Sequence, residues 1–340
     1  MDSELLLPRP EGLYCPAGDF FIDPMLPVPR AVVTHAHGDH ARSGSELYHV
    51  ASAGVGLMRE RLGATATIRD YAYGETFTLG DTRLSLHPSG HVLGAAQVRI
   101  EGRGLVAVVS GDYKRDPDPT CLPFEPVPCD VFVTESTFGL PIYHWPPMHA
   151  VIDDMLAWLD ECTERGVPAV LFCYALGKAQ RILAELATRT ERTVHLHGAM
   201  LRLVEAYREA GVRMLPTQPV SESARGKDFA GELIMAPPSA AGSPWMRRFA
   251  KASTGFASGW MQVRGARRRR GYDRGFIVSD HADWPGLLQS VRDCGAKRIY
   301  VTHGDGEALI RHLRETGHDA RPLRSLGGTV ADTRDSEEGD

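Results

Sequence analysis

Short apolar runs recur along the chain, and several of them end directly at a His, Asp or Glu residue. Three such runs occupy residues 31–33, 104–110 and 129–134, and the polar residues that follow them are His35, Asp112 and Glu135. Short apolar runs bounded by turn residues are typical of buried β-strands. We therefore predict strands whose ends deliver polar groups to one edge of a sheet.

The middle of the chain changes to an alternation of strands and helices. Apolar runs at 169–174, 194–196 and 232–235 are separated by helical periodicity at 179–186 and 200–210. This alternation predicts a small parallel sheet. The segment 141–274 is too long for a loop, so we expect it to be an insert with its own fold.

The strand pattern returns after the insert. Residues 275–278 predict a strand, Pro285 and Gly295 mark the ends of a helix, and 297–302 predicts a further strand that ends at His303. The last ten residues, 331–340, are acidic and lack a large apolar residue. We expect this tail to be disordered.

Length, charge and cysteine usage bound the class of protein. With 340 residues and a formal net charge of −5, the chain is long enough for two lobes but is not a generally basic nucleic-acid coat. It has no stretch of about twenty apolar residues and no basic-apolar leader, which predicts a soluble cytoplasmic protein with no membrane partner. The six cysteines form no C-x-x-C pair and are expected to be reduced.

The first strand leads into the densest chemical motif of the chain, Thr34-His35-Ala36-His37-Gly38-Asp39-His40. In an extended segment His35 and His37 point to one side, whereas Asp39 and His40 fall where a helix is expected to begin. Histidine and carboxylate ligands at this spacing favour one or two metal ions over solvated loop histidines.

Three further residues extend this motif. His91 lies between glycines, and Asp112 follows an apolar strand, where a carboxylate is able to bridge two cations. Asp23 ends a short apolar run before Pro24. It either orients a ligating imidazole or is an ordinary turn residue, and the sequence favours neither.

The order of His35-Ala36-His37-Gly38-Asp39-His40, His91 and Asp112 resembles the metallo-β-lactamase fold superfamily, and Thr134-Glu135-Ser136-Thr137 resembles its nucleic-acid-cleaving β-CASP branch. This resemblance implies an α/β fold, namely an αββα sandwich with an inserted β-CASP-type α/β cap domain. The sandwich would comprise 1–140 and 275–330, and the cap 141–274.

The resemblance also implies roles for individual residues. One zinc ion would be held by His35, His37 and His91, a second by Asp39, His40 and His303, and Asp112 would bridge them, with manganese as a substitute in vitro. Glu135 and His281 would complete the catalytic group together with Asp39 and Asp112, His281 binding the phosphate or protonating the leaving oxygen.

Within the branch, the segment Gly12–Gly18, the histidine motif and the compact length resemble the bacterial DNA-ligase-associated exonucleases. The implied function is a DNA exonuclease in repair that is associated with a DNA ligase. His303 is more typical of RNA-cleaving members, so RNA processing stays open as the alternative. A small-molecule metallo-hydrolase and a non-catalytic nucleic-acid-binding scaffold are less favoured.

Candidate substrate contacts lie outside the metal motifs. Ser136 and Thr137 follow Glu135, and Lys178 opens a helix where it would offer an ammonium to a phosphate. The basic run Arg267, Arg268, Arg269 and Arg270 is either a solvated loop or a rail for a nucleic-acid backbone. His195-Leu196-His197-Gly198 imitates the first motif, but no Asp-His pair follows, so we expect it to be structural.

Overall fold

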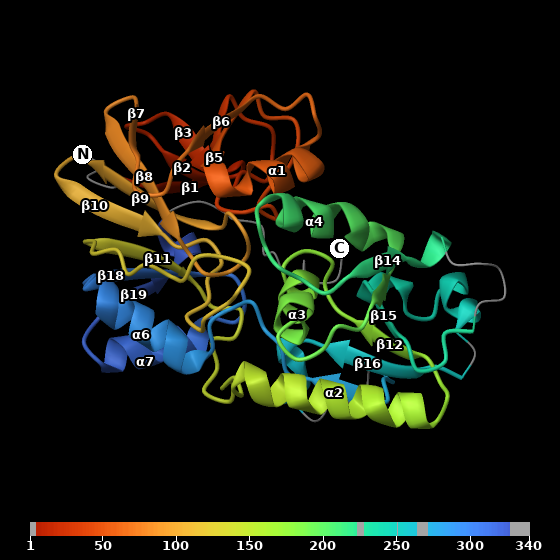
Figure 1. The fold of residues 1–340 in the computed structure, drawn as a ribbon. Helices are drawn as coiled ribbons and strands as arrows, with labels where there is room; N and C mark the ends of the chain where they lie inside the picture. The colour runs from red at the N-terminus through yellow and green to blue at the C-terminus, as the bar shows by residue number, and fades with distance from the viewer. Residues whose placement is uncertain (1–4, 223–227, 250, 264–270, 327–340) are drawn as a thin grey trace. The chain divides into compact units, whose positions relative to one another are not determined.

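The computed structural model describes residues 5–222, 228–249, 251–263 and 271–326. Contacts between Cα atoms divide the described chain into two units, one formed by 5–144 together with 281–326 and the other by 145–280 (Figure 1). The sequence placed the return to the first fold at residue 275, whereas the contacts change unit at 281. Arg267 to Arg270 and the acidic tail lie outside the described residues.

Unit 1, residues 5–144 and 281–326, contains two sheets. The strands of the first follow one another in sequence order: β1 (Leu7–Arg9), β2 (Gly12–Cys15), β3 (Phe20–Ile22), β4 (Arg30–Val32), β5 (Leu47–Ala51) and β6 (Ile68–Tyr71). Strands β3 to β6 pair in parallel. Helix α1 (Val55–Leu62) lies beside β5 and β6 in both ribbon views.

The second sheet combines early and late parts of the chain. Its order is β19-β18-β11-β10-β9-β8-β7. The bounds are β7 (Thr76–Leu79), β8 (Thr82–Pro88), β9 (Ala96–Gly102), β10 (Leu105–Val109), β11 (Val131–Glu135), β18 (Arg298–Thr302) and β19 (Asp319–Pro322). Strands β10, β11, β18 and β19 are parallel, so their carboxyl ends meet at one edge.

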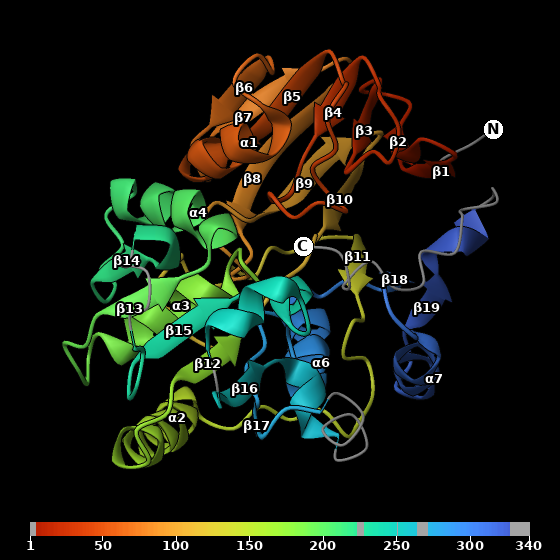
Figure 2. The ribbon, with the colours of Figure 1, turned by 90° about the vertical axis from the view of Figure 1, so that its right-hand side faces the viewer.

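The two sheets of unit 1 bury a common apolar core. Phe20 and Val32 from the first sheet pack with Leu84, Val98 and Tyr300 from the second. On the other face of the second sheet, α6 (Trp284–Cys294) and α7 (Glu307–Glu315) cover β10, β11 and β18 (Figure 2). Alternate residues of each central strand are therefore buried on opposite faces, which explains the nearly continuous apolar runs.

Unit 2, residues 145–280, is built on a third sheet. All of its pairings are parallel, in the order β14-β13-β15-β12-β16-β17. Its elements are α2 (Met148–Glu164), β12 (Ala169–Phe172), α3 (Lys178–Leu186), β13 (Val194–Leu196), α4 (Gly198–Glu209), β14 (Thr217–Pro219), β15 (Leu233–Ala236), β16 (Ser253–Ala257) and β17 (Arg274–Phe276). The expected small parallel sheet is thus present, with strands and a long first helix that the periodicity did not reveal.

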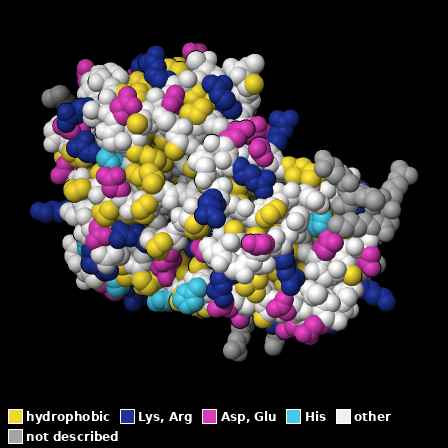
Figure 3. Space-filling model, in the orientation of Figure 1, with side chains coloured by type: hydrophobic (Ala, Val, Ile, Leu, Met, Phe, Trp, Pro, Cys, Tyr) yellow, Lys and Arg dark blue, Asp and Glu magenta, His cyan; other side chains and the backbone are white. Residues whose placement is uncertain are grey.

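Short 3₁₀ helices complete the described structure: η1 (Ser52–Gly54), η2 (Val220–Glu222), η3 (Pro238–Ala240), η4 (Pro244–Arg248), η5 (Gly259–Gln262) and η6 (Leu323–Leu326). The mixed α/β class is confirmed. Among the described residues, no helix is both long and apolar enough to cross a membrane. On the face shown in Figure 3, basic and acidic side chains are interspersed.

Candidate metal centre

The histidine motif lies in a turn that follows β4. The N–H of Ala41 donates to the carbonyl of His37 at 2.8 Å, which closes a single turn between residues 37 and 41. The helix expected to begin at Asp39 and His40 is absent, and the next α-helix, α1, starts only at Val55. The chain leaves this turn at Ala41, and Gly44, with a φ of +104°, belongs to the next turn before β5.

Three imidazoles converge in the first ligand group. His37 Nδ1 lies 3.0 Å from His35 Nε2 and 3.0 Å from His91 Nε2. Asp112 Oδ2 lies 3.5 Å from His35 Nε2. Neighbouring ligands on a tetrahedral zinc ion, with Zn–N bonds of about 2.0–2.1 Å, are separated by about 3.3 Å. The donor set and its spacing fit one zinc ion.

Asp39, His40 and His303 form the second ligand group. His40 Nε2 lies 3.6 Å from Asp39 Oδ2 and 3.5 Å from Asp112 Oδ2. His40 Nε2, Asp112 Oδ1 and His303 Nδ1 are buried atoms with no hydrogen-bond partner among the described residues. Buried polar atoms in proteins are normally satisfied, so these three atoms fit a bound cation.

Electrostatics differ between the two groups. Burial holds the pKa of His35 well below its ordinary value, which keeps its imidazole neutral and able to ligate. Burial acts the same way on His40, but Asp112, Asp39 and Asp23 outweigh it and raise the pKa of His40 well above its ordinary value. A cation and the His40 proton therefore compete for the same acidic surroundings.

Asp112 is the carboxylate that the two groups share. Its side chain also lies 3.8 Å from His91 Nε2 and 4.0 Å from His281 Nδ1. Burial alone would raise the pKa of this carboxyl, but the imidazoles of His40 and His281 hold it well below its usual range. Asp112 is therefore ionised among the rings that surround it.

Glu135 and His281 form a buried pair beside this centre. Glu135, at the end of β11, accepts the N–H of Tyr113 on Oε1 at 2.7 Å, and its Oε2 lies 2.8 Å from His281 Nδ1. The Phe138 ring lies against His281, with 5.9 Å between ring centres. The carboxylate is thus oriented by one backbone N–H and in turn orients the imidazole.

Asp23 contacts the centre through His40. Its Oδ2 lies 2.7 Å from His40 Nδ1, and its carboxylate accepts both the N–H and the hydroxyl of Thr34, at 2.7 and 2.6 Å. The residue has a φ of +44°, so it also occupies a tight turn. The two alternatives for Asp23 describe contacts that occur together.

His303 is delivered by a left-handed turn after β18. Its φ is +51° and that of Gly304 is +69°. A Cβ added at Gly304 would lie 2.5 Å from the carbonyl oxygen of Ser136, and the Ser136 hydroxyl donates to the His303 carbonyl. Ser136 is buried and fixes the His303 loop through this hydrogen bond, while Thr137 beside it is half-buried.

The remaining predicted residues lie in unit 2. Lys178 opens α3, where its side chain is buried and its Nζ lies 3.4 Å from Asp280 Oδ2. His195 pairs with Glu232, and His197 Nδ1 accepts the N–H of Ala199 at the start of α4. Among the described residues, no metal-ligand group includes either histidine.

Sequence reasoning did not single out main-chain groups near the site or the buried Arg181 of unit 2. Thr34 and Tyr113 contribute main-chain N–H groups, and nothing in a side-chain pattern marks a main-chain donor. Arg181 is buried and donates to the Ser279 carbonyl at 2.8 Å. Its position three residues after Lys178, on the same face of α3, was the available signal.

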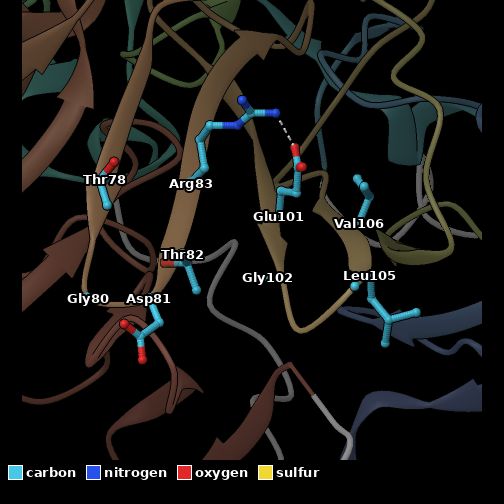
Figure 4. A pocket seen from close by; sticks show the side chains of 10 residues that line it. Thr78, Gly80, Asp81, Thr82, Arg83, Glu101, Gly102, Leu105 and Val106 are labelled. Atoms are coloured by element: carbon cyan, nitrogen blue, oxygen red, sulfur yellow. Dashed lines mark hydrogen bonds and ion pairs between the residues drawn. The ribbon is translucent and has the colours of Figure 1, made fainter.

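A hollow of about 500 Å³ lies elsewhere in unit 1, along the β7–β8 and β9–β10 hairpins (Figure 4). Its charged side chains include Arg83 and Glu101, which form an ion pair at 2.6 Å. None of the side chains of the two ligand groups lines it. The two histidine and carboxylate groups therefore lie outside this hollow.

Comparisons with known proteins identify relatives of the chain. No family model matches the chain. A probable DNA ligase of Opitutus terrae is 33% identical over 91% of this chain and 30% of its own length. The endoribonuclease Ysh1 of Gibberella zeae is 31% identical over 43% of this chain and 18% of its own, and that of Aspergillus fumigatus 32% identical over 36% and 14%.

The chain thus spans less than a third of the length of these relatives. A crystal structure of a protein of unknown function from Enterococcus faecalis V583 shares the fold, with a TM-score of 0.55 at 11% identity over 81% of this chain and 75% of that one. The matches to Ysh1 confirm the resemblance to the β-CASP branch of the metallo-β-lactamase superfamily that the histidine motifs carry.

Proposed function

We propose that the protein is a metal-dependent nuclease that hydrolyses phosphodiester bonds, acting as a DNA exonuclease in repair. The observation that carries this proposal is the convergence of two ligand groups on Asp112, with the Glu135–His281 pair beside them. In our proposal unit 1 is the αββα sandwich of the family and the insert 141–274 is its β-CASP cap.

Two zinc ions fit the ligand set. His35, His37 and His91 would hold one, Asp39, His40 and His303 the other, and Asp112 would contact both. Such a pair would supply Lewis acidity toward a water molecule and a phosphodiester. Asp23 would hold His40 in the orientation that presents Nε2, because it occupies the opposite ring nitrogen.

His281 would handle the substrate phosphate or the leaving oxygen. Glu135 engages Nδ1 of its ring, so Nε2 is the nitrogen that would face the phosphodiester. A positioned imidazole of this kind contributes about 10²–10⁴-fold as a general acid. The role of Glu135 is to hold the ring and to stabilise its charged form.

The relatives bear on the choice of nucleic acid. A protein named as a probable DNA ligase contains a segment similar to 91% of this chain, which supports a nuclease that prepares or trims ends for ligation. The matches to proteins named endoribonucleases, together with His303, support RNA processing as the second candidate. Ser136, Thr137 and Arg267 to Arg270 are kept here as proposed substrate contacts, whereas the buried side chain of Lys178 faces Asp280.

The test uses end-labelled DNA and RNA of matched sequence, with zinc, with manganese and after chelation. We expect stepwise shortening of DNA that requires metal and is lost in Asp112→Ala. His197→Ala is the matched control, because this histidine lies in a similar sequence but outside both ligand groups. Cleavage of RNA alone would replace the DNA proposal, and absence of cleavage of either polymer by the zinc-loaded protein would overturn the nuclease.

A further inference from the structure

We propose that Lys178 and Arg181 are positioning residues for His281: from one face of α3 they hold Ser279 and Asp280, the two residues that precede it. The inference rests on the proposed function for its activity readout. It assigns to Arg181 a role that the sequence did not indicate, and it gives Lys178 a role other than contact with a substrate phosphate.

The contacts are specific to consecutive residues. Arg181 donates from Nη1 to the Ser279 carbonyl at 2.8 Å, and Lys178 Nζ lies 3.4 Å from Asp280 Oδ2. Residues three apart on a helix share a face, so one surface of α3 engages both positions. A charged donor on a carbonyl makes a stronger hydrogen bond than a neutral one, which favours a fixed Ser279.

The burial of these charges is unusual. Lys178 and Arg181 are each 5% exposed and Asp280 is 3% exposed. Desolvation of buried ions costs as much free energy as their attraction returns, so such pairs are weak evidence for a stabilising role. What they do provide is a single permitted arrangement of the groups they join, here the backbone at 279 and the side chain at 280.

The helix that carries both cations is itself firmly placed. Gly177, with a φ of +88°, precedes α3 and donates its N–H to Gln180 Oε1 at 2.7 Å, while Gln180 Nε2 donates to the Ala175 carbonyl at 2.8 Å. Ile182 and Leu183 of the same helix are fully buried in the unit 2 core. Lys178 also lies over the Tyr174 ring, 4.5 Å from its centre.

His281 is the next residue after this anchored pair. On its other side the N–H of Ala282 donates to the Tyr113 carbonyl at 2.6 Å, and Asp283 caps α6 by accepting the N–H of Gly286 at 2.9 Å. Both flanks of His281 are therefore held by charged or main-chain contacts. Release of the 279–280 flank would let the ring leave Glu135.

Positioning and phosphate contact predict different kinetics. If Lys178 and Arg181 act through His281, their removal has no further effect once His281 is absent. If either touches a substrate phosphate, its loss multiplies with that of His281 and lowers the salt dependence of binding. A double-mutant cycle distinguishes these cases.

We expect Arg181→Gln to lower kcat on DNA by about 10–100-fold, the range seen when a supporting contact is removed. On a phosphodiester with a nitrophenolate leaving group, which departs without a proton, the loss should be much smaller. In a His281→Ala background Arg181→Gln should change kcat less than twofold. In protein that keeps His281, Arg181→Lys should retain part of the activity that Arg181→Gln loses. Lys178→Met should follow the same pattern.

Arg189→Gln is the matched control. Arg189 follows α3 and forms an ion pair with Asp153 in which both side chains are about half exposed. Its replacement should leave both substrates unaffected. The inference would be overturned if Arg181→Gln lowered kcat by the same factor with and without His281. It would also be overturned if Arg181→Gln changed the salt dependence of DNA binding.

A second readout is independent of activity. In zinc-loaded protein with ¹⁵N-labelled histidine, the Nδ1 signal of His281 is identified by its absence in His281→Ala. We expect Arg181→Gln to shift or broaden this signal while circular dichroism and metal content stay unchanged. An unchanged signal would refute positioning, whereas a wild-type protein that cleaves neither polymer would refute the nuclease and leave this measurement valid.

Discussion

Two His-x-His-Gly segments occur in the chain, and they have different surroundings. His35 and His37 follow β4 and meet His91 and Asp112, which arrive from other loops of unit 1. His195 lies within β13 and pairs with Glu232, and His197 is the N-cap of α4. A His-x-His-Gly segment alone therefore does not predict a metal site. Its chemistry depends on the side chains that neighbouring strands and loops place beside it.

The comparison also separates two uses of a histidine nitrogen. In the first segment His35 Nε2 and His91 Nε2 both lie 3.0 Å from His37 Nδ1, a nitrogen with one lone pair at most, which fits a cation between the three rings. In the second, His197 Nδ1 accepts a main-chain N–H at 3.1 Å and is satisfied. The predictions below test this separation.

The largest effect is expected from Asp112→Ala. Because Asp112 lies within 4 Å of His35, His40 and His91, its loss should remove support from both ligand groups. We expect its activity loss to exceed the about 10–100-fold anticipated for Asp23→Ala, which contacts His40 alone among the proposed ligands. Initial rates with metal content measured on the same samples check this. Equal activity losses in Asp112→Ala and Asp23→Ala at equal metal content would contradict the proposal that both ligand groups share Asp112.

Metal content should distinguish the two segments directly. The wild-type protein loaded with zinc and desalted is expected to hold about two ions per chain. His37→Ala should lose about one of them, whereas His197→Ala should keep both, since it lies outside both groups. Elemental analysis gives the answer. One zinc ion or none per wild-type chain, or a loss of zinc in His197→Ala, would contradict the assignment of metal binding to the first segment alone.

The smallest effect concerns the pH dependence of stability. Burial lowers the pKa of His197 below its ordinary value, so its cap contributes stability above about pH 6.5, where the unfolded residue is also neutral. This contribution is lost as the pH falls through the folded pKa, because protonated Nδ1 cannot accept the Ala199 N–H.

His197→Asn keeps a capping oxygen but does not titrate. Its unfolding free energy should therefore vary less between pH 7 and 5 than that of the wild type, by at most the about 1 kcal/mol of a helix cap. Denaturant titrations at both pH values measure the difference. Identical pH dependence in the two proteins would show that the cap is not proton-sensitive.

The sequence predicted those parts of the fold that depend on local pattern. The strands ending near His35, Asp112 and His303 were visible because each is a short apolar run before a polar residue. The helix expected at Asp39 is replaced by the single turn 37–41, whose end no local pattern of residues marks. The contacts of α3 with Ser279 join residues about a hundred positions apart, which no local pattern reports.

The candidate site, like the fold, was predictable only where local sequence carries the information. Residue types and spacing identified the ligands, because histidine and carboxylate chemistry is carried by the side chain itself. The left-handed turn at His303 and the orientation of Glu135 by the Tyr113 N–H depend on backbone geometry. These features became visible only once the chain was folded.

The wide spacing of the ligands along the chain has a consequence for biosynthesis. A ribosome releases the segment with His35, His37, His91 and Asp112 well before His281 and His303. The three-imidazole group is thus available to a nascent chain, whereas the second group and the Glu135–His281 pair await synthesis of all of unit 2. Incomplete chains would therefore be able to capture a metal before the proposed nuclease site is complete.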